Sequence, residues 1–213
     1  MDKYTIREIL ERIKIKVCHD IIKRFEEIDE TPRMKIINKF GWSKKTCRKI
    51  SEKGEVDLLR YARDNGCMWN EYICDYVSEN GHLECLKYAH ENGCPWDEDT
   101  CMVASRGGHL ECLRYAHENR CPWDEWTCKV ASIFGHLKCL KYAHENGCDW
   151  NEDVCLFSSA YGHFECLKYA YENGCPWDKS TCSNASEGGY LECLKYACKN
   201  RTLKIASIKC MIE

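Results

Sequence analysis

Cysteine and histidine are the residues with which this chain could do chemistry. The 213-residue sequence has 19 cysteines and 8 histidines, and many of them cluster in short stretches such as GHLECLKYAHENGCPWDEDTC, residues 81–101. Thiolates and imidazoles are ligands that zinc prefers, and a cysteine beside a histidine can act as a nucleophile. A high cysteine content also suggests disulfides in a secreted protein. The residue types alone are therefore compatible with a zinc site, a cysteine nucleophile or a set of disulfides.

These residues recur with one strict period, the interval from Gly54 to Gly81. The period is marked by glycines (Gly54, Gly81, Gly108, Gly135, Gly162, Gly189), by tryptophans (Trp42, Trp69, Trp96, Trp123, Trp150, Trp177) and by three columns of cysteines (Cys47, Cys74, Cys101, Cys128, Cys155, Cys182; Cys85, Cys112, Cys139, Cys166, Cys193; Cys67, Cys94, Cys121, Cys148, Cys175). A catalytic centre is needed once, whereas a packing residue is needed in every layer of a repeat protein. The repetition therefore indicates structural roles.

The cysteine spacing argues against a metal site and against disulfides along a column. No two cysteines are as close as in a C-x2-C pair, and the smallest gap runs from Cys193 to Cys198. Packed helices lie about 8–10 Å apart, whereas a disulfide needs Cα atoms within about 7 Å, so a column cannot pair with itself. We expect reduced thiols that pack as small hydrophobic side chains, and a zinc site built across different columns stays open.

The other repeated polar residues also have structural interpretations. The histidines of one column are expected to line the turns: His82, His109, His136 and His163. The tryptophans are expected to fill the core with each N–H bonded to a carbonyl, and a set of short polar residues is expected to cap helices: Asn70, Asp97, Asp124, Asn151 and Asp178. No unique acid, base or nucleophile remains, so we expect no enzymatic activity, no metal and no cofactor.

Each repeat has the pattern of two short antiparallel helices. In HLECLKYAHEN, Leu83, Leu86 and Ala89 share one helical face. Asn92-Gly93 then supplies a left-handed stop, and a second helix is expected from Asp97 to about Ser105, ending at 107–108. A helix pair of this size cannot bury its own apolar face, so copies must stack. The predicted fold is an all-α solenoid with little or no strand.

The repeat ASRGGHLECLRYAHENRCPW resembles the ankyrin consensus A-A-x-x-G-H-x-x-V-V-x-x-L-L-x-x-G-A-D. Ala104-Ser105 stand at the paired alanines, Gly108-His109 at the Gly-His and Cys121 near the Gly-Ala. Ankyrin repeats have about 33 residues. The repeats of this chain are shorter, and the missing residues fall where the family forms its β-hairpin finger. The resemblance covers about residues 42–200. It is greatest to the fingerless arrays of giant viruses of amoebae and some protists.

The repeats divide the chain into a cap and an array. We expect an N-terminal helical cap at 1–41, a half unit at 42–53, units at 54–80, 81–107, 108–134, 135–161 and 162–188, and an altered C-terminal cap at 189–213. Residues 1–41 carry an apolar helical stripe from Ile6 to Ile28 with basic flanks. Its alternative role is a second docking element, such as an adaptor for a ubiquitin ligase, although the leucine-proline opening of an F-box is missing.

Composition and charge bear on location and on the class of partner. Hydrophobic residues make up 44% of the chain and charged residues 31%, and no apolar run approaches the roughly 20 residues that span a bilayer. The N-terminal residues lack the pattern of a secretory signal, so we expect a cytoplasmic protein, in the host cytoplasm if viral. Residues 1–53 have 15 basic and 9 acidic side chains, and the rest has 16 and 25. We therefore expect neither membrane nor nucleic acid as a partner.

Function is expected where the repeats differ. The variable columns begin at Tyr72, Asp75, Tyr76, Glu79 and Asn80, and these positions form one face of the helix that follows each tryptophan. The resemblance to ankyrin proteins implies that this helix lines a concave groove where partner proteins bind. The predicted partner-binding residues are Tyr72, Tyr76, Glu79, Met102, Arg106, Trp126, Lys129, Ile133, Phe134, Asp153, Leu156, Phe157 and Tyr161.

Six of these residues are predicted to form an apolar patch over two adjacent units, rimmed by charges: Trp126, Ile133, Phe134, Leu156, Phe157 and Tyr161. The alternative is that some of them, especially in the Val103/Phe157 column, pack between units. The sequence thus predicts a monomeric, non-enzymatic scaffold, with a viral host-interaction role, that binds another protein. A thiol- or metal-responsive structural protein is the alternative from a different class.

Overall fold

The computed structural model describes residues 44–200 except 65 and 68, and within this range every regular element is a helix. We call one set the inner helices: α3 (Lys44–Lys53), α5 (Glu71–Glu79), α7 (Glu98–Gly107), α9 (Glu125–Ile133), α11 (Glu152–Ala160) and α13 (Lys179–Glu187). The outer helices are α4 (Val56–Asp64), α6 (Leu83–Glu91), α8 (Leu110–Glu118), α10 (Leu137–Glu145) and α12 (Phe164–Glu172), and residues 191–200 are also helical. The predicted all-helical solenoid is confirmed.

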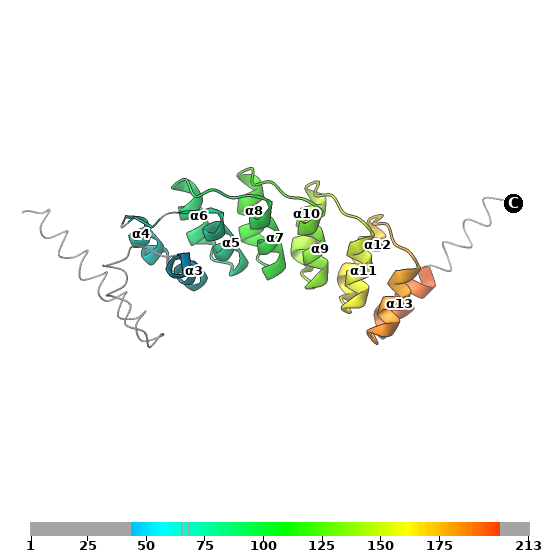
Figure 1. Ribbon diagram of the computed structural model, residues 1–213. Coiled ribbons are helices and arrows are strands. Elements are labelled where there is room, and N and C mark those ends of the chain that lie inside the picture. The colour runs from blue at the N-terminus through cyan, green and yellow to red at the C-terminus, as the bar shows by residue number, and fades with distance from the viewer. Residues whose placement is uncertain (1–43, 65, 68, 201–213) are drawn as a thin grey trace, which may run out of the picture.

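The helices form two rows along a bent arc, with the inner helices on its concave side (Figure 1). Each inner helix contacts the next inner helix, as α7 contacts α9, and each outer helix contacts the next outer helix, as α8 contacts α10. Within a hairpin the two helices contact each other, as α7 contacts α8. The chain therefore builds the array by adding one hairpin to the next.

One continuous core runs through the array from Ile50 to Cys193. An outer helix contributes a cysteine, a leucine and an alanine, which in α8 are Cys112, Leu113 and Ala116. An inner helix contributes mostly small residues, which in α7 are Thr100, Cys101, Val103, Ala104 and Ser105. Small side chains let neighbouring inner helices approach each other closely. Tyrosine and tryptophan also pack between neighbouring outer helices and keep them farther apart. This difference in spacing bends the array.

The histidines that precede the outer helices join neighbouring hairpins. His163 Nε2 lies 2.9 Å from the carbonyl oxygen of Ile133 in the preceding hairpin, and His82 Nε2 lies 2.9 Å from that of Glu52. Because a carbonyl only accepts, Nε2 must carry the proton. Gly135 leaves room for the His163 ring, which a Cβ at this position would overlap. These histidines thus do more than line the turns.

A second set of histidines supports the tryptophans on the outer row. His117 stacks on Trp123 with ring centroids 3.8 Å apart, and its Nδ1 lies 3.0 Å from the hydroxyl of Tyr142 in the next hairpin. The same arrangement recurs at His90 and His144. The tryptophans are half-buried at the edge of the core, because the histidine ring covers one face and leaves the rim exposed.

The prediction that each tryptophan N–H finds a carbonyl is wrong for Trp69. Its Nε1 is buried without a hydrogen-bond partner within the described part of the chain. In the structure, ring contacts hold this side chain, with Tyr88 at 5.7 Å between centroids and the Arg63 guanidinium 4.8 Å from its ring. Packing against rings therefore holds this tryptophan without the expected hydrogen bond.

Four of the five predicted caps are confirmed. The side chains of Asp97, Asp124, Asn151 and Asp178 each accept a hydrogen bond from the backbone N–H two residues on. The prediction is wrong for Asn70, whose side chain makes no capping hydrogen bond, and nothing in its surroundings explains the difference. The predicted N-terminal cap at 1–41 and the part of the predicted C-terminal cap from 201 onward lie outside the described residues. Among the described helices, none has the length and apolar character needed to cross a bilayer.

The contact between glycine and histidine gives a first prediction. Gly135→Ala places a methyl group against His163 at a positive φ of 74°, so it should lose the 2.9 Å bond to Ile133 as well as a favourable backbone conformation. Gly147→Ala is the matched control, because its φ is 86° and nothing lies within 4 Å of the added atom. Urea unfolding should show a loss of about 1 kcal/mol for Gly147→Ala and about 2–3 kcal/mol for Gly135→Ala. Equal losses would contradict a joining role for His163.

Arg120 gives a prediction in the opposite direction. It has φ 67° at the end of α8, where the equivalent residues after α6, α10 and α12 are glycines, such as Gly147. The side chain is exposed, so its removal sacrifices no packing. Arg120→Gly should raise the free energy of unfolding by about 0.5–1 kcal/mol, and Gly147→Arg should lower it by a similar amount. Denaturant titration of both variants is the measurement, and a destabilised Arg120→Gly protein would refute the assignment of backbone strain.

Candidate functional site

The predicted partner-binding residues lie on the inner helices or at their C-terminal ends, and none of them is fully buried. Four aromatic side chains are between 46% and 50% exposed: Tyr72, Trp126, Phe134 and Tyr161. The others are half-buried: Tyr76, Glu79, Met102, Arg106, Lys129, Ile133, Asp153, Leu156 and Phe157. Within the described range the remaining exposed large hydrophobic residues are Tyr190 and Leu191, next to the last outer helix. We call the set of predicted residues the inner face.

Helix capping positions the first exposed column. The backbone N–H of Trp126 donates to Asp124 Oδ1 at 3.0 Å, and the backbone N–H of Asp153 donates to Asn151 Oδ1 at 3.0 Å. The residue whose N–H is capped is the second of its helix, so the cap fixes the backbone from which its side chain projects. The variable residue therefore changes from repeat to repeat while its backbone stays in place.

The middle of the inner face is a cluster built around one lysine, which we call the Trp126 cluster: Trp126, Lys129, Asp153, Phe157 and Tyr161. Lys129 Nζ lies 4.0 Å from the Trp126 ring centroid and 5.2 Å from that of Phe157. The same Nζ forms an ion pair with Asp153 Oδ2 at 2.6 Å. Phe157 and Tyr161 stack with centroids 6.2 Å apart. The lysine therefore connects α9 to α11 and holds the aromatic rings in a defined arrangement.

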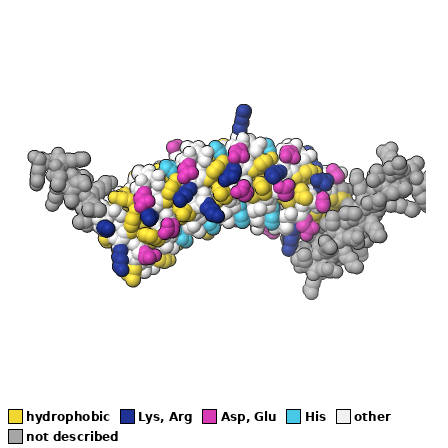
Figure 2. Space-filling model, turned by 180° about the vertical axis from the view of Figure 1, so that it is seen from behind, with side chains coloured by type: hydrophobic (Ala, Val, Ile, Leu, Met, Phe, Trp, Pro, Cys, Tyr) yellow, Lys and Arg dark blue, Asp and Glu magenta, His cyan; other side chains and the backbone are white. Residues whose placement is uncertain are grey.

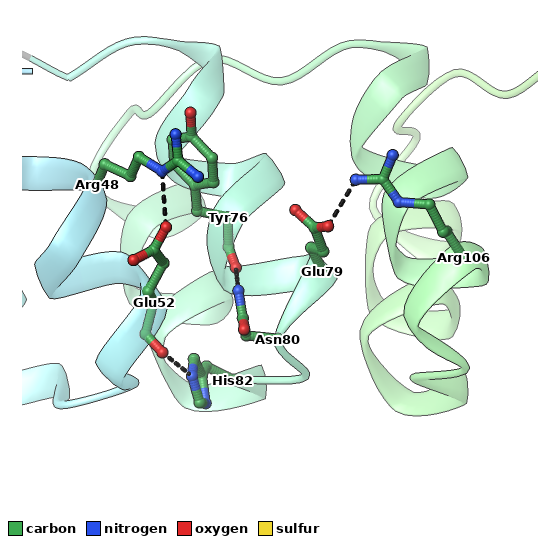
Figure 3. A network of polar contacts seen from close by, with 7 residues as sticks. All are labelled: Arg48, Glu52, Tyr76, Glu79, Asn80, His82 and Arg106. Carbon is green, nitrogen blue, oxygen red and sulfur yellow. Dashed lines mark hydrogen bonds and ion pairs between the residues drawn. The ribbon is translucent and has the colours of Figure 1, made fainter. Parts of the chain in front are cut away.

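Toward the first hairpins the inner face is a ladder of polar contacts (Figure 3). The Arg48 guanidinium lies 4.8 Å from the Tyr76 ring centroid, and its Nε donates to Glu52 Oε1 at 2.6 Å. The hydrogen bond to Glu52 is the largest cause that raises the pKa of Arg48. Arg48 lies outside the predicted residues, because it belongs to the half unit at 42–53 and the variable columns begin at Tyr72. Its arrangement resembles the Trp126 cluster, with a cation against an aromatic ring of the next inner helix.

The charged residues of the inner face are paired across hairpins. Arg106 Nη2 lies 2.6 Å from Glu79 Oε1 of the preceding hairpin, as Figure 3 shows, and Lys129 pairs with Asp153 of the following one. Figure 2, seen from behind, shows acidic and basic side chains interspersed with hydrophobic ones along the array. Exposed ion pairs contribute little stability, so here their main effect is to neutralise and orient charge.

Two columns of the predicted face partly turn into the core. Val103 and Val130 are only 6% exposed, so these two valines pack between units, as the alternative for their column states. Tyr76 and Phe157 in the same column stay half-buried. Asp75 is buried and accepts a hydrogen bond from Thr100 Oγ1 at 2.7 Å. The exposed part of the variable face therefore excludes Asp75, Val103 and Val130, and its most exposed columns are those that hold Trp126 and Tyr161.

The thiols require a correction. The cysteines from Cys74 to Cys198 are free, as predicted, but Cys67 is disulfide-bonded, so the expectation of reduced thiols throughout is wrong. The distance between cysteines of one column in successive repeats does not exclude such a bond, because thiols of different columns meet inside a hairpin. Cys101 on α7, for example, is hydrogen-bonded to Cys121 after α8. A strict period gives every pair of columns a constant offset, so the sequence alone does not single out the two columns that meet.

The described residues contain no group of three or more histidine, cysteine, aspartate or glutamate side chains that could hold a metal ion. The inner face thus offers no cluster for metal chemistry within that range. It offers exposed aromatic rings, half-buried apolar side chains between them, and charges that are already paired. This combination suits the burial of another surface.

Comparison with known proteins places the fold. No family model matches the sequence, and no curated protein matches it. Among solved structures, the chain is similar to the crystal structure of the human ASB11 ankyrin repeat domain, with a TM-score of 0.61 and 15% sequence identity. The match covers 70% of this chain and 80% of that one. The stacked hairpins, the Gly-His turns and this likeness together show that the chain has the ankyrin-repeat fold.

Proposed function

We propose that the protein is a non-enzymatic scaffold that binds another protein along its inner face. One observation carries the proposal. Of the six exposed large hydrophobic side chains in the described range, four lie at variable positions on or directly after inner helices. Exposed aromatic residues gathered on one face are typical of protein interfaces, where tryptophan and tyrosine supply much of the binding free energy.

The arrangement of the Trp126 cluster supports tight binding. Lys129 is held between two rings and paired with Asp153, so its side chain is already ordered and its charge balanced before a partner arrives. Ordering side chains and leaving charges unpaired are two of the main costs of association. A partner that covers Trp126 therefore gains apolar burial at a small entropic cost.

The surface also limits the chemistry of the partner. An apolar or aromatic anchor of the partner packs against the exposed parts of the Trp126 and Tyr161 rings, and its polar groups meet the paired charges of the inner face. Residues 54–213 have 16 basic and 25 acidic side chains, so long-range attraction favours a partner with a basic surface. A protein fits these conditions better than a nucleic acid, because phosphate binding calls for a basic stripe.

The proposal extends to source and location. The short, fingerless repeats resemble those of giant viruses of amoebae, so we place the partner among host proteins and the complex in the host cytoplasm. We also propose that the protein acts as a monomer. The alternative of a ubiquitin-ligase adaptor rests on residues 1–41, which lie outside the described range, and gains no support from the inner face.

Substitution of the exposed aromatics tests the proposal. Full-length wild-type protein is immobilised, the proteins it retains from host-cell lysate are identified, and the dissociation constant of a purified partner is measured. Trp126→Ala and Tyr161→Ala should each weaken binding by about thirtyfold, which corresponds to about 2 kcal/mol. Their free energies of unfolding should stay within about 0.5 kcal/mol of the wild type, because both rings are about half exposed.

Leu191→Ala is the matched control. Leu191 is an exposed large hydrophobic residue, 65% accessible, that begins the helix at 191–200 and does not belong to an inner helix. Its substitution should leave the dissociation constant unchanged. If Leu191→Ala weakens binding as much as Trp126→Ala does, the partner does not use the inner face. If Trp126→Ala unfolds the protein, the residue belongs to the core.

A further inference from the structure

Two of the three cysteine columns meet inside each hairpin. The Cys101 thiol on α7 is hydrogen-bonded to the Cys121 thiol, which follows α8 of the same hairpin. The same contact recurs in three other hairpins, and we call the four contacts the dithiol pairs: Cys74/Cys94, Cys101/Cys121, Cys128/Cys148 and Cys155/Cys175. All eight side chains are at most 4% exposed.

The second cysteine of each pair is anchored to the backbone. Cys121 Sγ donates to the carbonyl oxygen of Asp97 at 3.1 Å, and the equivalent distances from Cys94, Cys148 and Cys175 are 3.3, 3.1 and 3.1 Å. A carbonyl only accepts, so the proton of Cys121 is used here, and Cys101 must donate to the Cys121 sulfur. Each pair is therefore an ordered chain of two thiols with a fixed end.

The structure contains an oxidised member of one of these columns. Cys67 stands one repeat before Cys94 in the same column, and it is disulfide-bonded. The repeated backbone at this position is therefore compatible with a disulfide. This observation is independent of the thiol contacts in the later hairpins, and it shows that this column admits an oxidised cysteine.

The third column provides an internal contrast. Cys85, Cys112, Cys139 and Cys166 are as deeply buried, one on each outer helix. For these thiols burial is the largest cause of a raised pKa, to about 11 for Cys85 and about 12 for Cys112. In the dithiol pairs the largest cause that raises the pKa of the first cysteine is the hydrogen bond to its partner thiol. The described cysteine side chains of all three columns are buried, so what distinguishes the dithiol pairs from the outer-helix column is the contact between two thiols.

We propose that the four dithiol pairs are oxidation sites, each of which converts to a disulfide within its hairpin by exchange with a small-molecule disulfide such as oxidised glutathione. One thiolate of the pair attacks the glutathione disulfide and releases one glutathione thiolate. The second thiolate of the pair then attacks the mixed disulfide and releases the other. The pair loses two electrons and two protons, and two molecules of reduced glutathione carry them away.

Burial determines when the exchange can occur. Only the thiolate reacts, and both the partner thiol and burial raise the pKa of the attacking cysteine, so the closed hairpin is inert. Exchange therefore proceeds from hairpins that open transiently, and it is faster at higher pH and in sub-denaturing urea. Once formed, each disulfide ties the first turn of the inner helix to the loop after the outer helix, which restricts the unfolded hairpin and stabilises the folded one.

Disulfide mapping of the full chain tests the proposal. Reduced protein is incubated with excess oxidised glutathione in sub-denaturing urea, free thiols are alkylated under denaturing conditions, and proteolytic fragments are sequenced by mass spectrometry. We expect four new disulfides that join the dithiol pairs, alkylated Cys85, Cys112, Cys139 and Cys166, and a higher Tm after oxidation. The same fragments identify the partner of Cys67. Retention of all eight thiols, lasting mixed disulfides with glutathione, or bridges that include outer-helix cysteines would overturn the proposal.

Two alanine variants separate pairing from burial. Cys101→Ala should lose one bridge, leave Cys121 alkylated and show a smaller rise in Tm on oxidation. Cys112→Ala, at an equally buried position, should form all four bridges. An unchanged set of bridges in Cys101→Ala would show that its partner was assigned wrongly. If an alanine variant does not fold, the disulfide map of the wild-type protein still tests the proposal.

Discussion

Apolar side chains of this protein leave water only where one hairpin covers the next. Leu86, Leu113 and Leu140 have no exposed surface, although each belongs to a helix of nine residues that is too short to be stable in isolation. The stacking therefore supplies the free energy that makes the helices form. It also fixes the glycines before α4, α6, α8 and α10, since the ring of the histidine one repeat later occupies the space beside each of them. Positions whose side chains are buried between neighbouring hairpins have to repeat, and this requirement produces the strict period.

Positions whose side chains are not buried between hairpins are released from this constraint, and the variable residues of the inner face occupy such positions. Trp126 and Asp153 occupy the same place in successive repeats and share a capped backbone, yet one is aromatic and the other acidic. The cap holds the backbone whichever side chain follows, so variation at this position costs little stability. The fold thus separates residues that maintain the array from residues that face outward, and chemical variety accumulates on the concave side.

The sequence predicts the features that depend on neighbours in the chain, and it fails where contacts depend on how a hairpin closes. The period, the helices, the stops at glycine and four of the caps follow from local patterns, as does the exposure of Trp126 and Tyr161. The burial of Val103 agrees with the alternative left open for its column, but the sequence does not decide it, because the same column also contains the half-buried Phe157. The thiol pairs were missed for the same reason. The rest of α7 and all of α8 separate Cys101 from Cys121 in the sequence, and only the closed hairpin brings them together.

The dithiol pairs and the inner face meet at the same turn of backbone. Cys148 Sγ donates to the carbonyl oxygen of Asp124, whose side chain caps the N–H of Trp126. A disulfide between Cys128 and Cys148 would remove the donor of the first contact, because neither sulfur would keep a proton. The Asp124 carbonyl also accepts the backbone N–H of Thr127 at 3.0 Å, so the turn retains its helical hydrogen bond. The thiols act on the core side of this turn and Trp126 on the solvent side, and oxidation can therefore reinforce the hairpin while the aromatic face stays in place.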